Sequence, residues 1–151
     1  MDRNRSFCTV FSVDQSPEKV FAAINDVGAW WTAEPGIEGK ATKVGDEFTY
    51  RYGDVHDSRQ KVTELVPGKK VVWQVLDARL DFTKNKAEWK GTQIVFDLEK
   101  KGDKTEVRFT HVGLVPEFEC FDACSNGWST YVNGSLQAYL MSGKRQPSPT
   151  W

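Results

Sequence analysis

The two histidines, His56 and His111, are the side chains of this sequence best suited to proton transfer near neutral pH. His111 alternates with Val107 and Phe109 in a segment typical of a β-strand, so its imidazole is expected to point inward. It is a candidate general base or ligand contact. A hydrogen-bonded core histidine is the favoured interpretation, because no nucleophile with a third orienting group can be placed beside it. His56 lies in a polar segment that predicts a solvated turn.

The three cysteines, Cys8, Cys120 and Cys124, predict neither a disulfide framework nor a metal site. Cys120 and Cys124 stand four residues apart and so share roughly one face of a predicted helix. A closed zinc site needs four ligands, and neither a Cys-x-x-Cys pair nor a histidine lies near them in the sequence. We therefore expect free thiols, no metal and no cofactor.

Three carboxylates, Glu34, Glu64 and Glu88, are candidates for the general acid of a cyclase- or hydrolase-like enzyme. That role requires burial, which raises the pKa of a carboxyl group. Solvated strand edges and loops are the alternative positions for these residues. Because no acid–base pair stands out in the sequence, an enzyme is the less favoured class.

Aromatic residues are frequent, with six tryptophans, four tyrosines and nine phenylalanines. Such side chains either wall a cavity for a small apolar ligand or fill the core, and core filling is the favoured interpretation for any one of them. The candidates for a cavity wall, which His111 joins as a polar member, are Trp31, Phe48, Tyr50, Trp73, Phe96, Phe109, Trp128 and Tyr131.

The elements that must position these residues follow from periodicity. Residues 5–13 alternate and predict a strand. Ser16 and Pro17 predict the N-cap and first residue of a helix, with a second short helical turn at 29–32. From Glu34 to Val112, apolar–polar alternation and short turns predict antiparallel strands with one solvated face. Within this stretch, residues 78–91 fit either a strand or an extended loop.

Apolar residues from Phe118 to Tyr139 recur at intervals of three and four, which predicts a helix of about six turns that Gly143 ends. Gly127 and Gly134 each cost roughly 1 kcal/mol inside a helix. They suggest close approach of another backbone or a ligand.

A helix with one wide apolar stripe has to bury that stripe, and the sheet is its only large partner. The sequence therefore predicts an α+β fold in which a curved antiparallel sheet of about six or seven strands wraps round a long C-terminal helix. A short helical pair follows the first strand. We expect one domain over residues 1–151, with an ordered core at about 5–143 and a frayed tail at 144–151.

Composition excludes several classes of function. Lys and Arg number 20 against 21 Asp and Glu, and no window is strongly basic, so nucleic-acid binding is not expected. No apolar run reaches the roughly 18 residues of a membrane helix. The N-terminus does not continue into the apolar region of a signal peptide. We expect a cytoplasmic protein without membrane insertion.

The order of elements and several local motifs resemble the START-like, or birch-pollen-allergen-like, superfamily with its helix-grip fold. Within it the chain is most similar to the family named for the activator of the ninety-kilodalton heat-shock chaperone ATPase. The resemblance covers about Phe7 to Gly143. Its motifs are SPEKVF at 16–21 with Trp30-Trp31, VTELVPGKKVVW at 62–73, TEVRFTHVGL at 105–114, and Gly127-Trp128 with Leu136, Tyr139, Leu140 and Gly143.

The resemblance implies a cavity between sheet and helix, and for the aromatic group as a whole it favours the cavity wall over the filled core. The expected function is therefore non-catalytic binding of a small hydrophobic or amphipathic molecule. Two alternatives stay open, because this fold hosts many functions. One is a protein-binding module that modulates a chaperone ATPase, and the other is a cyclase- or hydrolase-like enzyme that uses the same cavity.

Overall fold

The computed structural model describes residues 6–81 and 83–147. Both ends of the predicted domain, residues 1–5 and 148–151, lie outside the described residues. No helix in the described part of the chain is long and apolar enough to cross a membrane.

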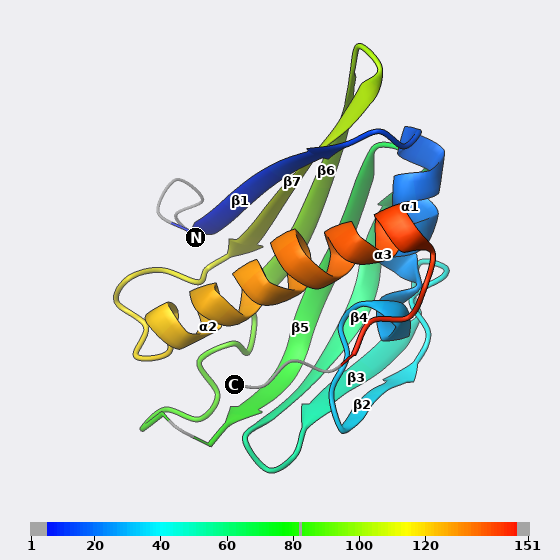
Figure 1. Cartoon of the computed structure of the whole chain (residues 1–151). Coiled ribbons are helices and arrows are strands. Elements are labelled where there is room, and N and C mark those ends of the chain that lie inside the picture. The colour runs from blue at the N-terminus through cyan, green and yellow to red at the C-terminus, as the bar shows by residue number, and fades with distance from the viewer. Residues whose placement is uncertain (1–5, 82, 148–151) are drawn as a thin grey trace.

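The described residues form one sheet of seven strands in the order β1-β7-β6-β5-β4-β3-β2, with every neighbouring pair antiparallel (Figure 1). Apolar–polar alternation in the sequence did not indicate the bounds of one strand, the short edge strand β2. The strands are β1 Phe7–Val13, β2 Pro35–Gly39, β3 Glu47–Tyr52, β4 His56–Val66, β5 Lys70–Leu80, β6 Gln93–Lys101 and β7 Lys104–Val112.

Two register shifts between β4 and β5, the longest strands, bend the middle of the sheet. They fall between Arg59 and Gln60 and between Val62 and Glu64. An irregularity of this kind bends a strand and increases its twist. The sheet consequently curves round a hollow face that can receive a helix.

Helices cover that hollow face. After β1 come α1, Pro17–Asn25, with Ser16 as its N-cap, and the 3₁₀ turn η1, Val27–Ala29. The first residue of this turn lies two positions before the predicted one. The C-terminal helix runs without a break through α2 Phe121–Trp128, the π-helical η2 Ser129–Leu136 and α3 Gln137–Ser142. It crosses the concave face of the sheet (Figure 1).

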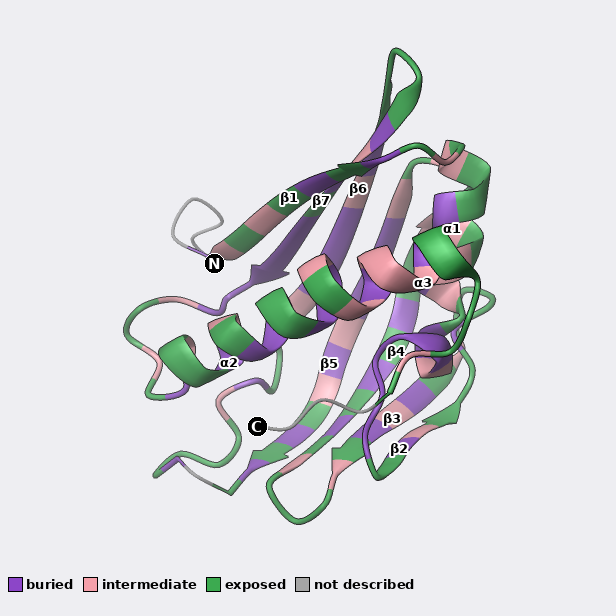
Figure 2. Cartoon of the chain, viewed as in Figure 1, coloured by how far each residue is buried: buried purple, intermediate pink, exposed green. Residues whose placement is uncertain are grey.

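The C-terminal helix buries the predicted stripe against the sheet and exposes its opposite face (Figure 2). Val132 and Leu136 are fully enclosed, and Trp128 is 2% exposed. Burial of such side chains is worth about 1.5–3 kcal/mol each. The predicted α+β helix-grip fold is confirmed.

Residues 144–147, which begin the predicted tail, are hydrogen-bonded rather than frayed. The backbone N–H of Gln146 donates to the Ala29 carbonyl at 2.9 Å. The Thr32 hydroxyl donates to the Pro147 carbonyl at 3.0 Å. Residues 146–147 therefore lie against η1 and the segment that follows it.

Substitution by alanine should change the stability of the fold in opposite directions at two glycines of the C-terminal helix. A Cβ atom at Gly134 would meet nothing within 4 Å, so the expected close approach is wrong there, and Gly134→Ala should stabilise the fold by about 0.8–1.0 kcal/mol. Gly143 caps the helix with φ of 72°, where a Cβ costs roughly 1–2 kcal/mol, so Gly143→Ala should destabilise it. Urea unfolding measures both changes, and equal effects of the two substitutions would contradict this assignment.

Candidate functional site

An apolar pocket with a cavity volume of about 240 Å³ lies between α2 and one end of the sheet. Its lining comes from the segment after η1, the β3–β4 hairpin, the connection between β5 and β6, and the C-terminal helix. The lining residues are Trp31, Tyr50, Tyr52, Val55, His56, Trp89, Ala123, Cys124, Gly127, Trp128 and Tyr131.

The sheet wall of the pocket is the tip of the β3–β4 hairpin. Tyr50 and Tyr52 alternate along β3 and so face the same side of the sheet. Tyr52 pairs with His56 across the hairpin, which brings the first residue of β4 onto the same wall. Val55, in the turn between the strands, lines the pocket at the tip.

Trp31 closes the inner end of the pocket. Its ring stacks on Tyr50, with ring centroids 4.3 Å apart, and tilts against Trp128 at 4.9 Å. The Tyr131 hydroxyl donates to the Thr32 carbonyl at 2.6 Å and lies 2.6 Å from the Tyr50 hydroxyl. Because Tyr131 uses its own hydrogen on Thr32, Tyr50 must donate to the Tyr131 oxygen. The two phenol groups are thereby fixed with their polar ends satisfied.

Trp89 also lines the pocket, and sequence reasoning missed it. It is 3% exposed, stacks on Trp128 at 5.6 Å and donates through Nε1 to the Cys124 sulfur at 3.3 Å. Trp89 lies in the connection between β5 and β6, where no periodicity indicates which side chains point inward. Its aromatic character was the one available signal.

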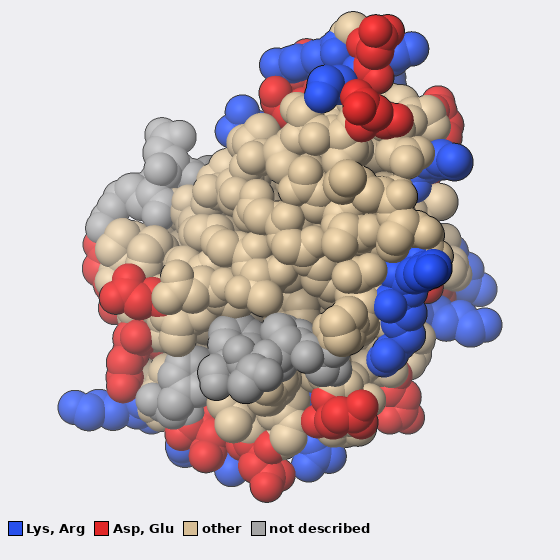
Figure 3. All heavy atoms as spheres, viewed as in Figure 1, with Lys and Arg blue, Asp and Glu red and all other residues tan. Residues whose placement is uncertain are grey.

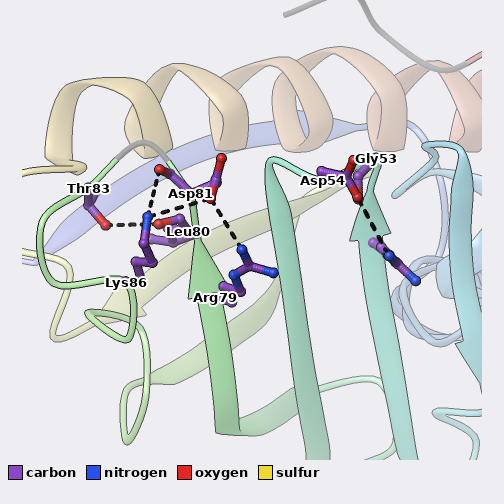
Figure 4. A network of polar contacts seen from close by, with 8 residues as sticks. Gly53, Asp54, Arg79, Leu80, Asp81, Thr83 and Lys86 are labelled. Atoms are coloured by element: carbon purple, nitrogen blue, oxygen red, sulfur yellow. Dashed lines mark hydrogen bonds and ion pairs between the residues drawn. The ribbon is translucent and has the colours of Figure 1, made fainter.

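Polar contacts at the end of β5 hold this connection in place (Figure 4). The backbone N–H of Leu80 donates to the Lys86 carbonyl at 2.8 Å, and the Thr83 hydroxyl donates to the Leu80 carbonyl at 3.1 Å. Arg79 and Lys86 both pair with Asp81, at 3.4 and 3.5 Å. Exposed pairs of this kind contribute about 0–1 kcal/mol each, so the backbone hydrogen bonds carry most of the anchoring.

His56 corrects the sequence interpretation. It is the first residue of β4 rather than part of a solvated turn, and its ring packs edge-on against Tyr50 and Trp89 at 5.1 and 4.5 Å. Nε2 lies 3.1 Å from the Ser58 hydroxyl. Burial lowers the pKa of His56 to about 3, so the ring is neutral at physiological pH.

His111 lies behind the pocket wall, in a hydrogen-bonded network. Trp128 Nε1–H donates to His111 Nδ1 at 2.9 Å, so this nitrogen is the unprotonated one. Nε2 of the neutral ring then carries the hydrogen and donates to the Thr92 hydroxyl at 2.8 Å. Burial, reinforced by His56, lowers the pKa of His111 to about 3. Both nitrogens are engaged, as the interpretation of a hydrogen-bonded core histidine requires.

The structure divides the nine candidate wall residues into two groups. Trp31, Tyr50, Trp128 and Tyr131 line the pocket. The other five pack in the adjoining core, with ring distances of 4.9 Å between Phe48 and Trp73 and 5.1 Å between Trp73 and Phe96. Outside the pocket lining lie Phe48, Trp73, Phe96, Phe109 and His111.

None of the three candidate carboxylates lines the pocket. Glu34 and Glu64 are exposed. Glu88 accepts backbone hydrogen bonds from Glu119 and Cys120 at 3.0 and 3.2 Å, which ties the β5–β6 connection to the start of α2.

Two cysteines are buried near the pocket and one is exposed. The nearby thiol of Cys124 and burial raise the pKa of Cys120, which keeps it in the weakly nucleophilic thiol form. Cys124 lines the pocket, whereas Cys8 lies on β1 at the surface. Among the described residues, no three His, Cys, Asp or Glu side chains gather as a metal site.

Among residues 6–81 and 83–147, no Lys, Arg, Asp or Glu lines this pocket. Burying an ionised group without a partner costs several kcal/mol, so the pocket disfavours charged molecules. An apolar cavity of about 150 Å³ can hold benzene. The larger cavity found here has room for a molecule of one or two rings.

The neutral state of His111 predicts a loss of stability in acid. The unfolded imidazole binds a proton below its ordinary pKa near 6.5, whereas the folded one does so only near 3, so the free energy of unfolding falls as the pH falls through this window. From pH 6.5 to 5 this residue should account for about 1.5 kcal/mol. His111→Asn keeps an acceptor for Trp128 but removes the titration, so its unfolding free energy should depend less on pH. Equal pH dependence of variant and wild type in urea titrations would contradict the assignment.

The sequence matches the family described as Activator of Hsp90 ATPase homolog 1-like protein over residues 14–141. No curated protein matches it. Among solved structures, the chain is similar to that of the Aha1 dimer from Colwellia psychrerythraea, with 30% identity and a TM-score of 0.72. That match covers 92% of this chain and 98% of the other.

Two further structures share the fold at lower identity. Protein MLL2253 from Mesorhizobium loti has 16% identity and a TM-score of 0.68, over 90% of this chain and 97% of its own. DynU16, a protein of the dynemicin biosynthetic locus, has 17% identity and a TM-score of 0.66, over 97% of this chain and 56% of its own. The family match spans most of the chain, including both the strands and the helix that wall the pocket. This chain belongs to the family of Activator of Hsp90 ATPase homolog 1-like proteins.

Proposed function

We propose that this protein binds a small, largely apolar molecule in the pocket between the β3–β4 hairpin and α2. The observation that carries the proposal is a cavity walled by aromatic rings, to which the described part of the chain contributes no charged side chain. Ligand pockets are mostly apolar with a few polar groups, and this cavity lies near the lower end of their usual size. Binding here requires no chemistry from the protein.

The pocket is also bounded by groups whose polar ends are already satisfied. Trp89 Nε1 donates to Cys124, and Trp128 Nε1 donates to His111. A molecule that enters therefore displaces no internal hydrogen bond of these rings. Its affinity comes from apolar area removed from water, at roughly 25 cal/mol per Å² before the cost of association.

A bulky side chain at the pocket rim tests the proposal. Ala123 is exposed on α2 and lines the pocket, so Ala123→Phe should obstruct the cavity without disturbing the core. Isothermal titration calorimetry with indane, a two-ring hydrocarbon, should show saturable binding to the wild type and its loss in this variant. Apolar burial also predicts a negative heat-capacity change.

The matched control is Ala138→Phe, which makes the same change in the same helix but outside this pocket. It should bind indane like the wild type. The proposal fails if the wild type does not bind indane or similar ring compounds, or if both phenylalanine variants bind equally well.

Protein binding is the second candidate function, and a separate observation favours it. Residues 123–143 contain no Asp, Glu, Lys or Arg, although charged residues make up 27% of the chain. Asn126, Ser129 and Thr130 are exposed along this helix, which lies in an uncharged area of the surface (Figure 3). Interface cores are depleted in charged residues. The Colwellia relative is described as a dimer, so we propose a second copy of the chain as the partner.

Introducing a charge on this helix tests self-association. In a two-fold symmetric dimer the same patch of both copies meets, so Thr130→Arg would place like charges together and should yield monomers. Val44→Arg, at a 59% exposed site between β2 and β3, is the control and should remain dimeric. Sedimentation velocity over a range of concentrations measures the distribution. A wild type that stays monomeric throughout would rule out this partner.

A further inference from the structure

The polar groups behind the pocket wall form a row along the inner face of β4. His56, Ser58 and Gln60 alternate with exposed residues, and Ser58 and Gln60 are 1% and 0% exposed. Gln60 Nε2 donates to the Ser58 hydroxyl oxygen at 2.6 Å, and His56 Nε2 lies 3.1 Å from that oxygen. Of these three side chains, only His56 lines the pocket, and Ser58 and Gln60 lie behind it.

The direction of these hydrogen bonds decides which form of His56 is present. Ser58 accepts from Gln60, so its own hydrogen still needs an acceptor, and a buried hydroxyl without one costs about 1–3 kcal/mol. Its acceptor among the described residues is His56 Nε2. Nε2 is therefore unprotonated, and in the neutral ring the hydrogen is on Nδ1.

This assignment places a donor of His56, the Nδ1–H group, at the pocket. His56 Nδ1 has no hydrogen-bond partner among the described residues. It is also not one of the side-chain nitrogen and oxygen atoms that are fully buried without a partner. The ring itself lines the pocket. The polar tips of Trp89, Trp128 and Tyr131 are by contrast already engaged.

We propose that His56 is the specificity-determining residue of the pocket and donates a hydrogen bond from Nδ1 to an oxygen of an uncharged cyclic ligand. The ligand class is a one- or two-ring molecule that carries a carbonyl or ether oxygen and no charge. This inference rests on the proposed ligand-binding function and adds the chemistry that the pocket selects. A carboxylate is disfavoured because none of the described residues that line the pocket is a cation that could compensate its desolvation.

Three probes of nearly the same shape separate these statements: indane, 1-indanone and indane-1-carboxylate. In the wild type, calorimetry should give about fivefold tighter binding of 1-indanone than of indane, the contribution of one neutral hydrogen bond. Indane-1-carboxylate should bind more weakly than either. His56→Phe retains a ring of similar size but has no donor, so it should lose the preference for 1-indanone over indane. Val44→Leu, at an exposed site outside the pocket lining, is the control and should keep the preference.

The results of these titrations distinguish ligand binding in the pocket from the proposed role of His56. If the wild type binds none of the probes, the proposed function and this inference both fail. If it binds indane and 1-indanone equally, the pocket binds ligands but the role of His56 is wrong. Tightest binding of the carboxylate would overturn the uncharged ligand class.

A second measurement does not depend on the stability of the variant. Long-range ¹H–¹⁵N spectra of the wild type report which nitrogen of each histidine carries the hydrogen. His56 should be protonated on Nδ1, and this signal should shift when 1-indanone is added but less when indane is added. A hydrogen on Nε2 of His56 would overturn the inference.

Discussion

The stacking of Trp31 between the sheet and the C-terminal helix is the contact on which the interior of this protein depends. Its ring lies 4.3 Å from Tyr50 on the sheet and 4.9 Å from Trp128 on the helix, and it is 1% exposed. On one side it is parallel to Trp73, at 6.2 Å, in a core filled by aromatic side chains. On the other side it lines the pocket. Trp31 therefore separates the filled part of the interior from the hollow part.

Hydrogen bonds explain why the hollow part does not collapse. The rings that could swing into it are held by their polar atoms: Trp89 by Cys124, Trp128 by His111, and Tyr131 by Thr32 (these three bonds are 2.6 to 3.3 Å long). A ring that turned to fill the space would leave a buried donor unpaired, at about 1–3 kcal/mol. Dispersion gained by closing the gap is offset by that cost. The cavity is thus a consequence of satisfied polar groups at its edges.

The sequence pattern predicted the fold because strands and helices differ in the spacing of their apolar residues. Alternation located most of the strands, and the three-and-four spacing of the C-terminal helix required a large apolar partner. The same patterning shows which face of an element is buried but carries no information on whether space remains between two buried faces. For that reason Trp31 and Phe48 were indistinguishable in the sequence, although one lines the pocket and the other fills the core.

Two of the lining residues that sequence reasoning missed, Trp89 and His56, were missed for separate physical reasons. Trp89 lies in an irregular connection, where burial follows tertiary contacts rather than period. His56 was assigned to a turn because it lies in the polar segment 53–57. Ser58 and Gln60, which share its face, are also polar and hide the inward alternation that continues to Val62. Every second residue counted back from Val62 faces inward, and this count would have placed His56 on the inner face.

The aromatic rings leave an open apolar cavity between the sheet and the C-terminal helix, and crystals of the protein under xenon pressure would reveal it directly. Dry apolar cavities of this size class bind xenon, which needs no hydrogen bond. We expect xenon density in the pocket, bounded by Trp31, Tyr50, Trp89 and Trp128, with these rings in the positions described. Rings closed together in this region, with no xenon between them, would contradict it.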